Sequence, residues 1–173
     1  GMGKDVSIGQ FGSSITNVGP NSIAIAAQSI GGGGGLVLSN TSSSNLINVT
    51  AVESIKIGGF VSTGSDAGKV TVDSDSAISV TGANAVGVLA QSIGGGGGLT
   101  ALTVNGKADS GSATIGGSSE TNAKGSDVNV TINKSLTVSG TSAVGVLAQS
   151  VGGGGGALLT SGYTGSNSTF SAG

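Results

Sequence analysis

Two carboxylates, Asp73 and Asp75, come closest to a catalytic arrangement in this chain. Residues two apart in a β-strand point to the same face, and paired carboxylates can act as acid and base in the cleavage of a glycosidic bond. The chain contains no arginine and no histidine to assist them, and the equivalent positions 58 residues later hold Thr131 and Asn133. We therefore interpret both aspartates as part of a solvated, outward strand face, and we assign no catalytic residue.

Three runs of five glycines, residues 31–35, 94–98 and 152–156, raise the possibility of phosphate binding. A phosphate loop needs a Gly-Lys-Ser/Thr sequence or a glycine pattern that enters a helix. These runs lead instead into Leu36, Leu99 and Ala157, without a lysine. Because glycine has no Cβ, it permits positive φ and close approach of two backbones. We predict that the runs are structural, as glycine strands lying flat against their neighbours, and that no cofactor binds.

One glutamine precedes each glycine run, at Gln28, Gln91 and Gln149. A glutamine in a repetitive β protein is expected to satisfy backbone groups at a corner, and a buried ladder of amides would also fit the rule that inward polar groups are paired. A metal site is not predicted, because the chain has no His or Cys and its glycine runs lack the regularly spaced aspartates of calcium-binding repeats.

A flat row of hydroxyls of the kind that binds ice is suggested by Thr71, Ser79 and Thr81. The threonines do not recur in register in the other units. We therefore do not assign this function.

The glutamines mark an internal repeat, since they lie 63 and 58 residues apart. The stretch from Ala85 to Gly98 returns from Ala143 to Gly156 with one change, and a looser copy runs from Ser22 to Gly35. Repeats at such periods indicate an array of similar structural units. We predict one repeat domain over residues 4–173, with units at about 4–69, 70–127 and 128–173, and we interpret residues 1–3 as a cloning remnant.

Apolar residues alternate with polar ones on a regular grid inside the units. The members occupy even positions in groups that begin eight residues apart: Val70 and Val72, Ile78 and Val80, Val86, Val88 and Ala90, then Val128, Val130 and Ile132, Leu136 and Val138, Val144, Val146 and Ala148. Alternation with period two predicts strands with one face inward. Short strands at fixed spacing predict an all-β, parallel β-solenoid. A helix over residues 85–92 is disfavoured by Gly87 and the following glycines.

The grid leaves the number of coils open. Each repeat of 58 residues would hold either two coils plus a loop of about ten residues or three coils of about 19. Residues 94–96 would fill the next strand position, and the end of the chain, residues 161–173, would begin a further coil. Ser54–Gly59 aligns with Ser112–Gly117, so the five extra residues of the longer period fall between Gly35 and Ser54. Polar loops are predicted at Ser39–Asn45, Ser62–Gly68 and Ser118–Asp127.

Composition excludes several partners. Charged residues make up 8% of the chain and the net charge is −2. Without a basic patch or an aromatic platform, nucleic acid is not an expected partner. The apolar segments are too short and too often broken by glycine and serine to insert into a membrane. The absence of cysteine excludes disulfides and thiolate metal sites but does not define a compartment.

The block Ala-Val-Gly-Val-Leu-Ala-Gln-Ser-Ile followed by five glycines resembles a repeat of very large autotransporter (type V secretion) passengers of Gram-negative bacteria. The similarity covers Ser22–Gly35, Ala85–Gly98 and Ala143–Gly156. It implies a right-handed parallel β-helix that is exported to the cell surface, anchored in the outer membrane through a barrel outside this sequence, and used in adhesion or as a stalk. No catalytic residue is implied, because the motif contains none.

From this resemblance we expect a non-enzymatic adhesin or rigid stalk whose loops contact glycans or proteins on host or neighbouring cells. The alternatives are a β-helical carbohydrate-active enzyme and a trimeric adhesin head, although the heads of that family repeat at a much shorter period. The array has no obvious caps, so its exposed strand edges also predict end-to-end self-association.

Overall fold

The computed structural model describes residues 1–42, 53–57, 65–105, 110–115, 122–161 and 167–172. All of its regular elements are β-strands, five in each of three successive coils. The first coil comprises β1 (Val6–Gln10), β2 (Ile15–Val18), β3 (Ile23–Ile30), β4 (Gly34–Ser42) and β5 (Glu53–Ile57). The second comprises β6 (Val70–Ser74), β7 (Ile78–Thr81), β8 (Val86–Ile93), β9 (Gly97–Asn105) and β10 (Ser110–Ile115). The third comprises β11 (Val128–Ile132), β12 (Leu136–Ser139), β13 (Val144–Val151), β14 (Gly155–Ser161) and β15 (Asn167–Ala172).

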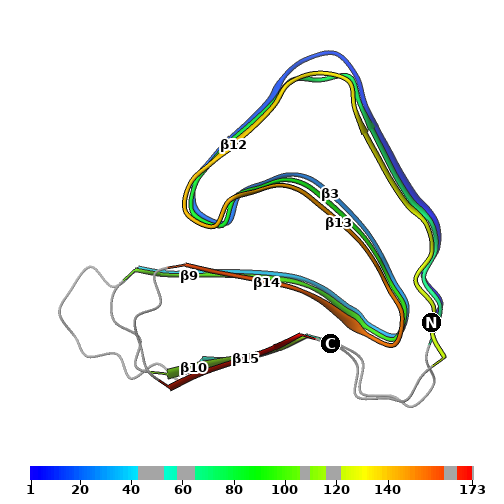
Figure 1. Ribbon diagram of the computed structural model, residues 1–173, viewed down its shortest axis with the longest axis vertical. Coiled ribbons are helices and arrows are strands. Elements are labelled where there is room, and N and C mark those ends of the chain that lie inside the picture. The colour runs from blue at the N-terminus through cyan, green and yellow to red at the C-terminus, as the bar shows by residue number, and fades with distance from the viewer. Residues whose placement is uncertain (43–52, 58–64, 106–109, 116–121, 162–166, 173) are drawn as a thin grey trace.

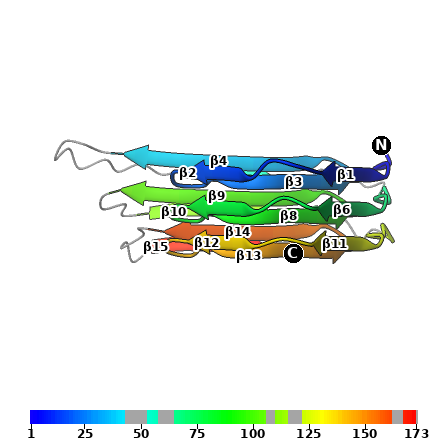
Figure 2. The same cartoon turned by 90° about the horizontal axis from the view of Figure 1, so that it is seen from above.

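Corresponding strands of the coils pair in parallel and form five sheets of three strands, each with the second coil in the middle. Figure 2 shows the three coils stacked one above another. The prediction of a parallel β-solenoid built from three repeats is confirmed, and the helix alternative for residues 85–92 is replaced by β8. The five strands of each coil fall within the three predicted units.

One repeat forms one coil, and the prediction of two or three coils per repeat was wrong. The chain closes a turn only after five strands, because β6 is the next strand to pair with β1. Viewed down the stack, β1, β2 and β3 enclose one lobe, the chain then reverses, and β4 and β5 lie beyond β3 (Figure 1). The eight-residue spacing correctly marked the strands of this first lobe, but it does not reveal where the coil closes.

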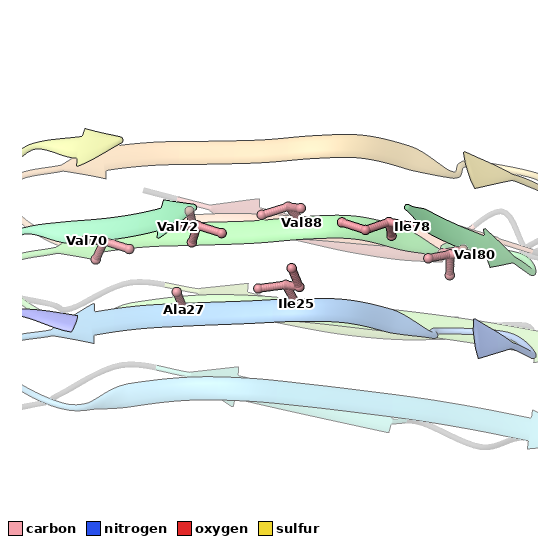
Figure 3. Packing of buried hydrophobic residues seen from close by; sticks show 9 residues of the cluster. Ile25, Ala27, Val70, Val72, Ile78, Val80 and Val88 are labelled. Carbon is pink, nitrogen blue, oxygen red and sulfur yellow. The ribbon is translucent and has the colours of Figure 1, made fainter. Parts of the chain in front are cut away.

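The first lobe contains the larger apolar cluster. Its buried members come mainly from the second coil, and they are Ile25, Ala27, Val70, Val72, Ile78, Val80, Ala85, Val88 and Ala90. Figure 3 shows these side chains on strands of the first and second coils, at neighbouring levels of the stack. A second cluster of Val86, Leu89 and Leu99 joins the opposite face of β8 to β9. The sheet of β3, β8 and β13 is therefore covered on both faces, which explains its nearly continuous apolar sequence.

The grid placed Val86 and Val88 on one face, and this prediction was wrong for Val86. Val86 packs in the second cluster, whereas Val88 packs in the first. The alternation is interrupted at Gly87, where an added Cβ would lie 2.5 Å from the carbonyl oxygen of Gly145 and 2.7 Å from a Leu136 methyl. A residue without a side chain is needed here because the third coil lies too close to this backbone for another methyl group.

The turn between the second and third strands of each coil has the same design. Asn21, Asn84 and Ser142 have φ values of 58°, 54° and 56°, a region in which asparagine is favoured among non-glycine residues. The N–H of Ala85 donates to the carbonyl of Gly82 at 3.3 Å, as in a four-residue turn. Pro20 lies in the first copy of this turn, between Gly19 and Asn21.

Three further predictions need correction. Residues 94–96 form a turn rather than a strand. Ser39–Ser42 belongs to β4 instead of a loop. Residues 167–172 form β15, which pairs with β10 and completes the third coil, so the end of the chain does not begin another.

Parts of the predicted loops lie outside the described residues. These are residues 43–45 of Ser39–Asn45, 62–64 of Ser62–Gly68 and 118–121 of Ser118–Asp127. The alignment of Ser54 with Ser112 is confirmed, because the two residues pair in register. The longer offset holds as far as Ser42, so the five extra residues lie between Ser42 and Glu53.

Candidate functional site

The glutamines that precede the glycine runs form an amide ladder whose middle member is buried. They are in register on β3, β8 and β13. Gln28 donates from Nε2 to Oε1 of Gln91 at 2.7 Å, and Gln91 donates from Nε2 to Oε1 of Gln149 at 2.6 Å. Gln91 is fully buried and also contacts the carbonyl of Gly98 at 3.4 Å. The amides therefore bond chiefly to one another, as the ladder prediction required, and only secondarily to backbone.

The serines next to these glutamines hold the opposite face of the same sheet. Ser29 donates from Oγ to the carbonyl of Lys4 and accepts from the N–H of Gly68, both at 2.8 Å. Ser92 repeats the pattern one coil later, with the Gly68 carbonyl and the Ser126 N–H. Each hydroxyl thus links the segments that enter two successive coils.

Sequence reasoning missed this serine column. The available signal was the Gln-Ser pair in every copy of the motif. Adjacent residues of a strand face opposite sides, so in a sheet buried on both faces a polar pair needs partners on both sides.

The glycine runs reverse the chain between the sheet of β8 and the sheet of β9. In the second coil Gly95, Gly96, Gly97 and Gly98 have φ values of 86°, 98°, 147° and 147°, and the other two coils follow the same course. A Cβ on Gly97 would collide with the carbonyl of Gly155, and one on Gly98 with the carbonyl of Gly35. Both structural reasons inferred for these glycines, positive φ and close backbone approach, are confirmed.

The run does not have the form of a phosphate loop, because it leads into β9. A phosphate loop instead directs its backbone N–H groups from the start of a helix.

Asp73 lies in β6 and Asp75 directly follows it, and both are partly exposed. The side-chain amide of Asn133, from the third coil, donates to Oδ1 of Asp75 at 2.7 Å and to Oδ1 of Asp73 at 3.4 Å. An amide shared between the two carboxylates ties one coil to the next on the outer surface. The structure thus brings Asn133 together with the two aspartates considered as an acid–base pair. The three side chains form a hydrogen-bonded contact between two coils.

The outward hydroxyls do not form a regular threonine array. Thr71 is paired with Ser7 and Asn129, and Thr81 is paired with Val18 and Ser139. The hydroxyls of Thr81 and Ser139 lie 3.2 Å apart. Ser79 is paired with Thr16 and Thr137, which gives one column of three hydroxyl residues. The columns of Thr71 and Thr81 contain an asparagine and an exposed valine, so the hydroxyls do not extend into a regular two-dimensional array.

Within the described ranges, no group of three or more acidic, His or Cys side chains is placed to hold a metal ion. The same part of the chain has no helix long and apolar enough to cross a bilayer. Comparison with protein-family models, with curated proteins and with solved structures finds no match to this chain.

Proposed function

We propose that this chain is a segment of a surface-exposed, autotransporter-type passenger that acts as an adhesin or as a rigid stalk projecting an adhesive region. The observation that supports the proposal best is the in-register stacking of all five strands across three coils. Each coil repeats the contacts of the one before it, so added coils increase length without a new design. An element of this kind works through reach and stiffness.

Stiffness comes from contacts that join the coils on both faces of the central sheet. The amide ladder lies on one face of this sheet and the serine column on the other. Because buried polar groups are costly when unpaired, sliding one coil over the next would break both columns together. We infer that the stack resists shear between coils, as a stalk under load must.

Adhesion would involve glycans or proteins on host or neighbouring cells. The candidate contact segments are the loops predicted at Ser62–Gly68 and Ser118–Asp127, together with residues 43–45 after β4, since connections between strands carry most of the variable surface in such folds. Residues 118–121 can be replaced without altering Lys124 and Ser126, whose backbone N–H groups bond to Asp66 and Ser92. Replacing residues 118–121 therefore tests a contact function while the hydrogen bonds that stack the coils are kept.

The test has two parts. Antibodies raised against the purified chain should label intact cells of the bacterium that encodes it. Labelling only after permeabilisation would reject surface exposure.

The purified chain should then be applied to a glycan array and to immobilised matrix proteins. Saturable binding that is lost when residues 118–121 are replaced identifies an adhesin, and no binding by a chain exposed on cells identifies a stalk. Cleavage of a polysaccharide that is abolished by Asp73→Asn or Asp75→Asn would favour the enzyme alternative and overturn the proposal.

A further inference from the structure

The corner between the first two strands of a coil is longer in the first coil than in the others. Four residues connect β1 to β2, whereas three connect β6 to β7 and three connect β11 to β12. The corner begins in register, because the N–H of Asp75 donates to the carbonyl of Gln10 at 2.9 Å. It also ends in register, because the N–H of Ile15 donates to the carbonyl of Ala77 at 2.9 Å. The extra residue is therefore accommodated as a bulge, in which Gly12 has a φ of 102°.

This bulge projects sideways from the stack. In Figure 1 the blue trace at the corner lies outside the outline that the other two coils share. The ring of Phe11, the first residue of the corner, lies over the outer side of Gly9, since a Cβ built on Gly9 would be 2.7 Å from Cε2 of that ring. Gly9 is paired with Asp73, which stays partly exposed although the second coil has a coil on each side. The ring, which is 65% exposed, therefore lies on the outer surface of the lobe and not on an end of the stack.

The ring lies beside two carboxylates of the second coil. Asp73 is the register partner of Gly9, and Asp75 follows the residue that pairs with Gln10. Oδ1 of each carboxylate accepts from the side-chain amide of Asn133, and each carboxylate has a second oxygen that can accept further hydrogen bonds. This part of the surface thus combines an aromatic face with hydrogen-bond acceptors that the third coil holds in place.

We propose that Phe11, Asp73 and Asp75 bind a basic segment of a partner protein, with an arginine side chain as the main contact. The face of an aromatic ring attracts a cation through its quadrupole. A guanidinium group can stack on such a ring and donate two parallel hydrogen bonds to a carboxylate. The two carboxylates only accept hydrogen bonds, so they match an arginine, which only donates, better than a sugar hydroxyl, which does both.

The site names the kind of protein that an adhesin of this type would contact, and in that respect it rests on the proposed function. It is separate from the loops considered above, because it consists of the outer face of β6 and the corner after β1. One nearby charge opposes a basic partner. Lys134 follows Asn133 directly and is exposed, so its ammonium group should weaken the binding of a cation.

The experiment measures binding of the purified chain to an immobilised synthetic peptide in which arginines are spaced by glycine and serine. The control peptide has citrulline in place of every arginine, which keeps the shape of the side chain and removes its charge. Biolayer interferometry should show binding to the arginine peptide at low ionic strength, at least about tenfold tighter than to the citrulline peptide. Added salt should weaken this binding, because the contacts lie on an exposed surface.

The contribution of the ring is tested with Phe11→Leu, which keeps an apolar side chain and removes the aromatic face. It should weaken binding of the arginine peptide about threefold to tenfold. Val18→Ala is the control, since Val18 is another outward residue of the first coil and is 80% exposed. This variant should bind as the wild type does, and circular dichroism checks that both variants are folded.

The contribution of the carboxylates is tested with Asp75→Asn, which should weaken binding about fivefold or more. Asp127→Asn removes the same charge from another exposed position. Because Asp127 precedes the start of β11 and lies away from the ring, this control should bind nearly as the wild type does. Lys134→Gln should strengthen binding about twofold.

Three results would overturn the site. These are equal binding of the arginine and citrulline peptides, wild-type binding by Phe11→Leu, and a loss for Asp127→Asn as large as that for Asp75→Asn, which would mean that only the net charge matters. Binding to a neutral glycan that Phe11→Leu abolishes, without binding to the arginine peptide, would assign the ring to a sugar and reject a basic partner. Antibody labelling of intact cells tests surface exposure separately, so failure of this site and failure of the proposed function are distinguishable.

Discussion

Strands β8 and β13 have the same sequence except at their last residue, Ile93 or Val151, but their environments differ. All eight residues of β8 are buried, whereas burial alternates along most of β13 and Val146 is 40% exposed. The difference arises because β8 has a coil on both sides and β13 has a coil on one. Neighbouring coils in the stack lie about 4.8 Å apart. Burial of a side chain therefore depends on the adjacent coil as much as on its packing inside the apolar lobe.

This comparison indicates how stability is distributed along the chain. In repeat proteins the free energy of folding is approximately a sum of terms for each unit and for each interface between units. The second coil contributes to two interfaces, and each end coil contributes to one. Matched substitutions in the second and end coils should therefore separate the contribution of stacking from that of local structure.

The largest difference is expected for alanine in the glycine runs. Gly98 and Gly35 are in register and have φ values of 147° and 148°, so alanine is strained to the same degree at both, by about 1–3 kcal/mol. A Cβ on Gly98 would collide with the Gly35 carbonyl, whereas a Cβ on Gly35 has no atom within 4 Å. Gly98→Ala should lower the free energy of unfolding by about 1–3 kcal/mol more than Gly35→Ala.

Urea unfolding followed by circular dichroism measures both alanine variants. Equal losses would mean that backbone strain alone explains these glycines and that close stacking adds nothing.

A difference of similar size is expected in the amide ladder. Gln91→Leu removes hydrogen bonds to both Gln28 and Gln149, while Gln149→Leu removes only the bond to Gln91. Because a buried polar group left without its partner costs about 1–3 kcal/mol, we expect Gln91→Leu to lower the free energy of unfolding by about 2–4 kcal/mol. Gln149→Leu should lower it by about 1 kcal/mol. A Gln149→Leu variant as unstable as Gln91→Leu would contradict the expectation that the middle glutamine contributes most to the stability of the ladder.

A smaller difference is expected in the apolar core. Val88→Ala removes two methyl groups from a fully buried site, whereas Val146→Ala removes them from a site that is 40% exposed. From about 0.8 kcal/mol for each buried methyl or methylene group, Val88→Ala should lower the free energy of unfolding by about 1.5–2 kcal/mol. The loss for Val146→Ala should be about half as large. The two variants would be indistinguishable in urea unfolding if a neighbouring coil had no part in burial.

The smallest effect is expected on the outer surface. Asp75→Asn and Asp73→Asn alter the contacts to Asn133, and interactions between exposed polar or charged groups usually contribute less than about 1 kcal/mol. Thermal unfolding of both variants, with Asn133→Ala as the variant that removes the two contacts together, measures this contribution. A loss above about 2 kcal/mol for any of the three would place these residues among the main links between the coils.

Several features of the solenoid could be predicted from sequence because they depend on local patterns. The even-numbered valines and isoleucines of β6 and β7 reflect strand alternation, which the neighbouring residues determine. The offsets of 63 and 58 residues reappear as the register of Gln28 with Gln91 and of Gln91 with Gln149. Parallel stacking of identical motifs places like residues side by side, so the amide ladder could also be anticipated.

Other features depend on which side of a strand the rest of the chain occupies. Val86 packs opposite to its predicted face because the sheet of β8 is covered by β9 as well as by the first lobe. The serine column was missed for the same reason. The two aspartates received attention as a potential acid–base pair, but their shared partner Asn133 comes from the next coil, and only the stacking of the coils brings it there.

The sequence by itself determined the repeats, the strands, the positive-φ turns and the polar residues that must be paired, because each follows from backbone sterics or from residues close along the chain. Only the tertiary structure decided that one repeat makes one coil. The glycine run at residues 94–98 folds the chain back along the outside of the first lobe before the coil closes. The point at which the coil closes depends on packing between β8 and β9, in which Leu89 and Leu99 belong to one apolar cluster. The residue spacing within a single strand does not determine this packing.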